Sequence, residues 1–155
     1  MSGPAPARSA RSVPPDASVV PADTVQAYRE SDYRIAAVPP LVLRVDRASA
    51  ALRALHAVHD VTSSVFLTAC NPWGRLRDAE WNRQRQAELA VALRQQGFAV
   101  IDGIGRHPTN DWPGEPSFLV LGPDRAAALE LGRRHEQNAV IWCDTDAVPR
   151  LLLLR

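Results

Sequence analysis

The sequence predicts one α/β domain, with a single mixed β-sheet of about five to six strands and about three helices in two or three layers. Three observations lead to this fold class. The chain has 155 residues, of which 46% are hydrophobic and 23% charged, so it can bury one sizeable core. Short apolar runs alternate with segments whose apolar residues recur at helical spacing. One pair of runs, 98–103 and 117–122, has no helix between its members, which favours a mixed sheet over a purely parallel one.

Residues 1–22 are predicted to form a disordered tail ahead of a single domain at 23–155. The tail is rich in Pro, Ser and Ala and has no apolar periodicity, so it cannot bury enough surface to offset the entropy of ordering. Residues 24–38 then predict a short helix followed by an extended segment.

The next elements are a strand, a helix and a second strand. Segment 41–45 is a short apolar run bounded by Pro40 and Asp46, and it predicts a strand. Segment 47–59 carries apolar residues at helical spacing. Segment 63–70, with the sequence SSVFLTAC, is almost continuously apolar, as expected of a strand that is covered on both faces.

The second half of the chain continues this alternation. Asp78 is a suitable N-cap for a helix that ends at Gly97. Strands are predicted at 98–103 and 117–122, with a long polar loop at 104–116 between them. The last elements are predicted as a helix at 123–137, a strand at 138–144 and a final strand at 150–155.

Net charge and cysteine content indicate which partners and which cellular compartment to expect. The formal net charge is +1, which argues against nucleic acid and against a membrane surface as partners, because the chain has no strong overall field. No apolar run approaches the roughly 20 residues that a membrane helix needs. Cys70 and Cys143 lie in apolar runs, where cysteines behave as small buried hydrophobes. The sequence therefore predicts a cytoplasmic protein in a reducing compartment.

Polar side chains are predicted to converge at one edge of the sheet. A helix joins strands 63–70 and 98–103, so these strands should run parallel and end at the same edge. Strand 117–122 should return antiparallel and, like strand 139–143, start at that edge. The polar residues expected there are Thr68, Asn71, Asp102, Trp112, Glu115, Ser117, Gln137 and Asn138. The sequence thus predicts a polar pocket at this edge.

Two residues have alternative roles within this pocket. Asn82 lies on the inward face of a first helical turn, where it contacts a ligand, holds the preceding loop, or does both. Glu115 is the candidate catalytic residue, as a general base. It could equally accept a hydrogen bond from a ligand, or pair with Arg29 or Arg85.

Other motifs are weaker. The glycines of GIGRHP at 103–108 lack the third glycine and the helix of a phosphate loop, so they predict a tight turn. His107 in this segment could serve chemistry, but a histidine in such a loop is more often solvated. His56 and His59 resemble a metal pair, but they lie at the opposite sheet edge without further ligands, so no metal site is predicted.

Five short motifs follow one another in a characteristic order: YRESDYR at 28–34, TACNPWG at 68–74, Asn82, GIG before DWPGEPSFLVLG, and EQNAVIW at 136–142. With these motifs the chain resembles the bacterial domain-of-unknown-function family 3293 over about residues 28–145. The resemblance implies a shared polar signature and supplies no activity or cofactor. In this sequence the residues of that signature are Tyr28, Arg29, Thr68, Asn71, Pro72, Asn82, Glu115, Ser117 and Gln137.

Two functions fit these observations. The first is a pocket for a small polar or nucleotide-like ligand, with amides for recognition and Tyr28, Trp73 and Trp112 as stacking surfaces. The second is a non-enzymatic interaction or regulatory module whose tryptophan-bearing rim binds another protein. A concave pocket favours the first function and a flat rim favours the second.

Overall fold

The computed structural model describes residues 18–155, so most of the predicted tail lies outside the described residues. Within the described part, the side chain of Val20 is buried and the first helix begins at Ala22. The last residues of the predicted tail therefore pack on the domain.

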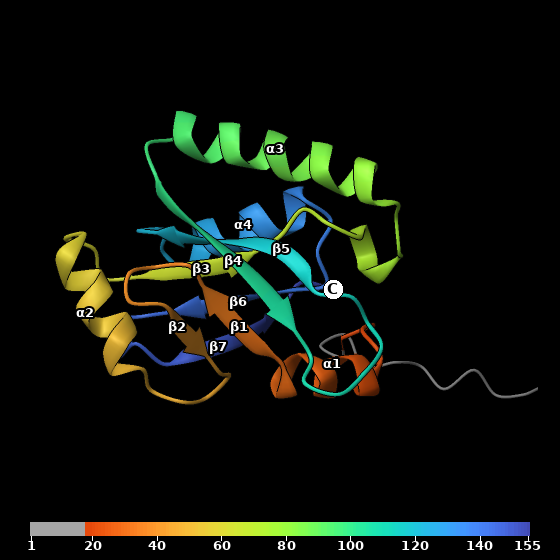
Figure 1. Ribbon diagram of the computed structural model, residues 1–155, viewed down its shortest axis with the longest axis horizontal. Coiled ribbons are helices and arrows are strands. Elements are labelled where there is room, and N and C mark those ends of the chain that lie inside the picture. Colours follow the sequence, from red (N-terminus) through yellow and green to blue (C-terminus); the bar gives the residue numbers. More distant parts are fainter. Residues whose placement is uncertain (1–17) are drawn as a thin grey trace, which may run out of the picture.

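The sheet of the described chain has seven strands, in the order β2-β1-β4-β5-β3-β6-β7 (Figure 1). Three hairpins, β1–β2, β4–β5 and β6–β7, are arranged with the single strand β3 between the last two. The strands are β1 (Asp32–Ile35), β2 (Leu41–Leu43), β3 (Ser64–Leu67), β4 (Ala99–Arg106), β5 (Glu115–Leu121), β6 (Ala139–Cys143) and β7 (Pro149–Leu153).

The predicted mixed sheet is wrong, because every pair of neighbouring strands is antiparallel. β3 and β4 do run in the same direction, as expected, and they are near-neighbours. β5 lies between them, antiparallel to both, because it forms a hairpin with β4 and also pairs with β3. No two parallel strands therefore touch in the described sheet.

Helices cover both faces of the sheet. The described helices are α1 (Ala22–Glu30), α2 (Ala50–Val58), α3 (Ala79–Gln95) and α4 (Arg125–Arg134), with a short 3-10 helix, η1 (Pro72–Gly74). α3 and α4 contribute to the core on one face, and α2 contributes to the core on the other. Side chains cap three of these helices, since Ser49, Asp78 and Asp124 each accept a hydrogen bond from a backbone N–H of the first turn. The predicted N-cap Asp78 is confirmed.

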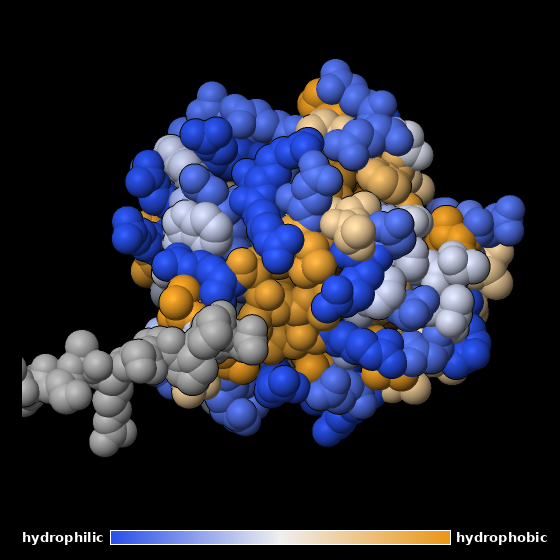
Figure 2. Space-filling view, turned by 180° about the vertical axis from the view of Figure 1, so that it is seen from behind, coloured by the Kyte–Doolittle hydropathy of each residue, from blue (hydrophilic) through white to orange (hydrophobic). Residues whose placement is uncertain are grey.

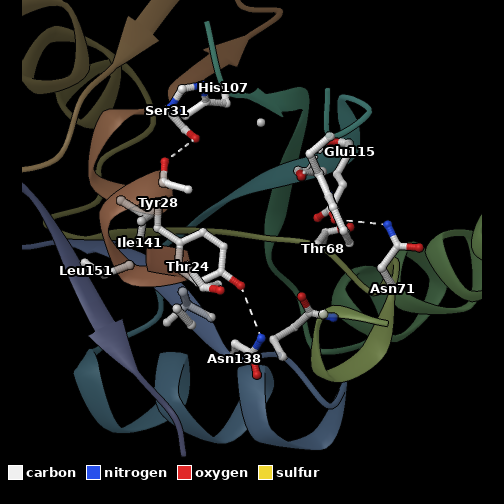
Figure 3. A pocket seen from close by; sticks show the side chains of 18 of the residues that line it. Thr24, Tyr28, Ser31, Thr68, Asn71, His107, Glu115, Asn138, Ile141 and Leu151 are labelled. Atoms are coloured by element: carbon white, nitrogen blue, oxygen red, sulfur yellow. Dashed lines mark hydrogen bonds between the residues drawn. The ribbon is translucent and has the colours of Figure 1, made fainter. Parts of the chain in front are cut away.

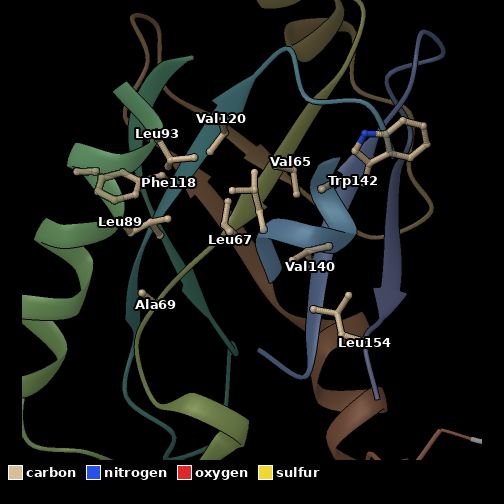
Figure 4. Packing of buried hydrophobic residues seen from close by; sticks show 13 residues of the cluster. Val65, Leu67, Ala69, Leu89, Leu93, Phe118, Val120, Val140, Trp142 and Leu154 are labelled. Carbon is tan, nitrogen blue, oxygen red and sulfur yellow. The ribbon is translucent and has the colours of Figure 1, made fainter. Parts of the chain in front are cut away.

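β3 is the centre of the core, as its apolar run predicts. All four of its residues are buried. Val65 and Leu67 pack against α3 and α4 (Figure 4), whereas Phe66 faces the α2 side. Because side chains alternate along a strand, both faces of β3 must be covered to bury them all.

Gly103 and Gly105 lie within β4, so the predicted tight turn is wrong. A Cβ atom on Gly103 would lie 2.7 Å from the ring of Phe66 and 2.7 Å from the carbonyl oxygen of Arg34. A side chain there cannot fit, and the glycines let two aromatic rings pack onto β4. These rings belong to Tyr33 and Phe66, which meet edge to face with centroids 5.2 Å apart.

Among residues 18–155, no helix is long and apolar enough to cross a membrane. In the same part of the chain, no cluster of three or more His, Cys, Asp or Glu side chains could hold a metal ion. Both cysteines are free and buried, as expected.

Candidate functional site

A cavity of about 510 Å³ lies at the edge of the sheet where β3 ends and where β5 and β6 begin (Figure 3). α1 forms one wall, through residues between Pro21 and Ser31. The convergence expected from the topology is present at this edge. Nδ2 of Asn71, just after β3, donates a hydrogen bond to Oε1 of Glu115, the first residue of β5, at 3.0 Å.

The floor of the cavity is apolar and aromatic. Tyr33 and Phe66 line it together with Ile141 and Leu151, which belong to β6 and β7. Gly105 lies beside the two rings, and a Cβ atom there would already be in van der Waals contact with both. The glycine-bearing half of β4 therefore keeps the floor open and lined by ring faces.

Glu115 places its carboxylate in this cavity, half-buried. Its Oε1 accepts hydrogen bonds from Nδ2 of Asn71 at 3.0 Å and from the indole Nε1 of Trp112 at 2.9 Å. Its Oε2 accepts none from the described residues. Burial raises the pKa of Glu115, and the two hydrogen bonds only partly oppose this rise.

Of the alternative roles considered for Glu115, pairing with Arg29 or Arg85 is absent from the structure. Arg29 pairs with Asp46 at 3.0 Å, and Arg85 pairs with Glu88 at 3.3 Å. Both guanidinium groups lie on the surface and do not line the cavity. Within the described chain, amide and indole donors therefore hold Glu115, with no ion pair.

Asn82 holds the loop that carries Asn71. Its Oδ1 accepts a hydrogen bond from the backbone N–H of Asn71, and its Nδ2 donates to Oδ1 of Asn71, each at 2.9 Å. These bonds hold Asn71 in the left-handed region, at φ 48°. Asn82 is absent from the walls of the cavity; it borders a second hollow, of about 670 Å³, that also touches Asn71 and Glu115. Of the two roles considered, the geometry matches the loop-holding one.

Three further predicted residues line the cavity and bond to nearby carbonyls. The hydroxyl of Thr68 donates to the carbonyl oxygen of Pro116 at 2.7 Å, and that of Ser117 donates to the carbonyl oxygen of Glu115 at 2.9 Å. Nε2 of Gln137 donates to two carbonyl oxygens, those of Cys70 and His135, each at 3.1 Å. The bonds of Thr68 and Gln137 join the starts of β5 and β6 to the end of β3, and the bond of Ser117 lies within β5.

Tyr28 brings α1 to the cavity. Its phenol oxygen accepts a hydrogen bond from Nδ2 of Asn138 at 3.2 Å, and its carbonyl oxygen accepts one from the hydroxyl of Tyr33 at 2.6 Å. Burial raises the pKa of Tyr28. The other two predicted stacking residues, Trp73 and Trp112, also line the cavity.

His107 is not the solvated residue that its loop position suggests. Its Nδ1 accepts hydrogen bonds from the backbone N–H groups of Thr109 and Asn110, at 3.1 and 3.0 Å. Its Nε2 therefore carries the proton and donates to Glu30 at 2.9 Å, with the side chain only 12% exposed. This residue ties the loop after β4 to α1, a contact between distant segments that no sequence spacing indicates.

One residue expected at this edge, Asp102, lies elsewhere. Asp102 is exposed in the middle of β4, because that strand continues to Arg106 and moves the sheet edge further along the chain. Asn138, by contrast, lies where the topology expects it, and sequence reasoning gave it no role. His56 is remote from the cavity, and its Nε2 lies 2.8 Å from Oγ of the buried Ser64.

Residues 67–140 match the model of a family described as a protein of unknown function, DUF3293. The matched segment contains Thr68, Asn71, Asn82, Glu115 and Gln137, and it leaves α1 outside. No curated protein and no solved structure matches the chain.

Proposed function

We propose that this chain, whose residues 67–140 match the DUF3293 family model, binds a small polar or nucleotide-like ligand in the cavity between α1 and the sheet edge. The observation that carries the proposal is the carboxylate of Glu115, which is recessed in the cavity with one oxygen free of protein donors. Desolvating a carboxylate without a cationic partner is unfavourable. Such groups concentrate at functional sites.

The shape and lining of the cavity support a small ligand. Its volume of about 510 Å³ is within the range of small-molecule sites. Aromatic and aliphatic side chains form the floor, and a few polar groups lie at the sheet edge, which is the usual composition of such sites. In this proposal Glu115, Tyr28 and Gln137 contact the ligand, while Asn71 and Asn82 position Glu115.

Glu115 is also the acid–base group of the site, if the ligand reacts there. A raised pKa brings a carboxylate closer to the range in which it exchanges protons near neutral pH. The proposed base needs no arginine or metal to set its pKa, because burial alone raises it.

Ligand retention tests the proposal. The purified protein is incubated with a metabolite extract, and the compounds that remain bound after gel filtration are identified by mass spectrometry. Glu115→Gln should fold and lose the compound that the wild type retains. Glu88→Gln, on the exposed face of α3, is the matched control and should retain it. Retention that is equal in all three proteins, or absent from the wild type, would contradict the proposal.

A second candidate function is a non-enzymatic interaction module that uses the tryptophan-bearing rim. Trp112 is 39% exposed at the mouth of the cavity. Figure 2 shows hydrophobic residues gathered in one area of the rear face and bordered by hydrophilic side chains. The concave site favours the ligand proposal. Loss of a partner from Trp112→Ala in a pull-down, with ligand retention absent from the wild type, would favour the module.

A further inference from the structure

We infer that the ligand presents a planar, positively charged nitrogen group, an amidinium or a guanidinium, to Oε2 of Glu115. This inference rests on the proposed function and narrows its ligand class. It is based on two kinds of observation. Some hydrogen-bonding groups of the cavity are already bonded within the protein and others are free, and charged and aromatic side chains surround the free ones.

Four polar side chains at the sheet edge donate hydrogen bonds within the protein. The hydroxyl protons of Thr68 and Ser117 go to backbone carbonyl oxygens. Nε2 of Gln137 donates to two more carbonyl oxygens, and Nδ2 of Asn138 donates to the phenol oxygen of Tyr28. These four side chains therefore direct donors to the protein, whereas the phenol O–H of Tyr28 and the indole N–H of Trp73 have no acceptor among the described residues.

Two oxygen acceptors at the same edge are free. Oε2 of Glu115 and Oε1 of Gln137 accept no hydrogen bond from the described residues, and neither oxygen is sealed from solvent. The amide of Gln137 is oriented by its own contacts, because its nitrogen faces two carbonyl oxygens and an oxygen there would be repelled. A ligand that fits these acceptors must supply N–H or O–H donors.

Charge selects a cation among such donors. The charged side chains that line the cavity are Asp23 and Arg106, both exposed, and the recessed Glu115. Glu115 has no cationic partner within the described chain, so a cation bound at Oε2 would neutralise it in a site of low polarity. A charge-assisted bond to a carboxylate is also stronger than a neutral one.

The rings select a planar group. Tyr28, Tyr33, Phe66 and Trp112 all line the cavity. A delocalised cation can stack on these faces while its N–H groups point at oxygen acceptors, which a compact ammonium does less well. Amidinium and guanidinium groups have both properties.

Three probes with the same ring and different head groups test the inference: benzamidine, benzamide and benzoate. The readout is the indole N–H signal of Trp112 in ¹⁵N-labelled protein, because that N–H bonds to Glu115 and reports on its carboxylate. The signal is assigned among the four tryptophans by its loss from Trp112→Phe. Benzamidine should shift it, with an affinity at least about tenfold higher than that of benzamide or benzoate.

Glu115→Gln should weaken benzamidine binding by at least about tenfold, because the amide keeps the shape and removes the charge. Glu88→Gln should bind like the wild type. If benzoate or benzamide bound as tightly as benzamidine or more tightly, the inference of a cationic ligand would be wrong, although a ligand site would still be present. If no probe changed the signal, the inference of a cationic ligand would also be wrong. The retention experiment would then test the proposed function independently.

Discussion

At the scale of single residues, Glu115 links the stability of the fold to the site. Its raised pKa means that the folded protein keeps this proton to a higher pH than the unfolded chain does. The free energy of unfolding should therefore fall as pH rises from the ordinary carboxyl range through the raised pKa. Glu115→Gln lacks this dependence, so its stability relative to the wild type should increase with pH. Urea unfolding at several pH values measures the difference.

Glu88→Gln serves as the control for this pH series, since Glu88 is on the surface. Its stability difference from the wild type should stay nearly constant with pH. A flat difference for Glu115→Gln as well would show that the recessed carboxylate does not carry the predicted linkage.

Asn82 is predicted to matter for stability more than for ligand contact. Asn82→Ala removes both side-chain bonds to Asn71 and leaves the backbone N–H of that residue without its acceptor. The cost should be about 1–3 kcal/mol in the free energy of unfolding. Gln84→Ala, on the exposed face of the same helix, should be close to neutral. A neutral Asn82→Ala would refute the loop-holding role.

At the scale of elements, α3 is the support for one side of the site. It contributes Leu89 and Leu93 to the core, and its Gln86 accepts a hydrogen bond from the backbone N–H of Ala69 at 3.0 Å. Asp78 caps this helix by accepting from the N–H of Trp81 at 2.8 Å. Asp78→Ala should lower the free energy of unfolding by about 0.5–2 kcal/mol.

The matched variant for this cap is Asp78→Asn, which keeps an oxygen acceptor and should retain most of the stability. Chemical denaturation of both variants gives the comparison. If the two variants lost the same stability, the charge of Asp78 rather than its capping bond would be the cause.

At the scale of the whole molecule, α1 is the least firmly packed wall of the cavity. None of its residues is buried. It is held by polar contacts, which include the bonds from Tyr33 and Asn138 to Tyr28 and the bond from His107 to Glu30. In hydrogen exchange, the amides of α1 should exchange faster than those of α3, and a bound ligand should slow them. Exchange in α1 as slow as in α3 would contradict this view of the wall.

The sequence predicted the elements and the meeting point well, for physical reasons that are local. A continuous apolar run requires cover on both faces, and β3 has it. The helix between β3 and β4 carries the chain back across the sheet, so both strands end at the same edge. β5 begins at that edge, which is why Asn71 and Glu115 meet. The family resemblance is confirmed for residues 67–140.

What the sequence did not predict depends on contacts between distant segments. The insertion of β5 between β3 and β4 is decided by pairing across the sheet, which periodicity along one strand does not encode. Gly103 suggested a turn, whereas the ring of Phe66 is what excludes a side chain there. The hydrogen bond from His107 to Glu30 likewise joins residues far apart in the chain.

The strand order also determines when, during synthesis, the sheet and the cavity can be completed. The pairings β1–β4, β3–β5 and β3–β6 each join segments that are distant in sequence, so β1 and β3 leave the ribosome well before their partners. The cavity needs α1 from the beginning of the described chain and β6 and β7 from its end. The walls of the cavity are therefore complete only after β7 has been synthesised and the first and last described elements have met.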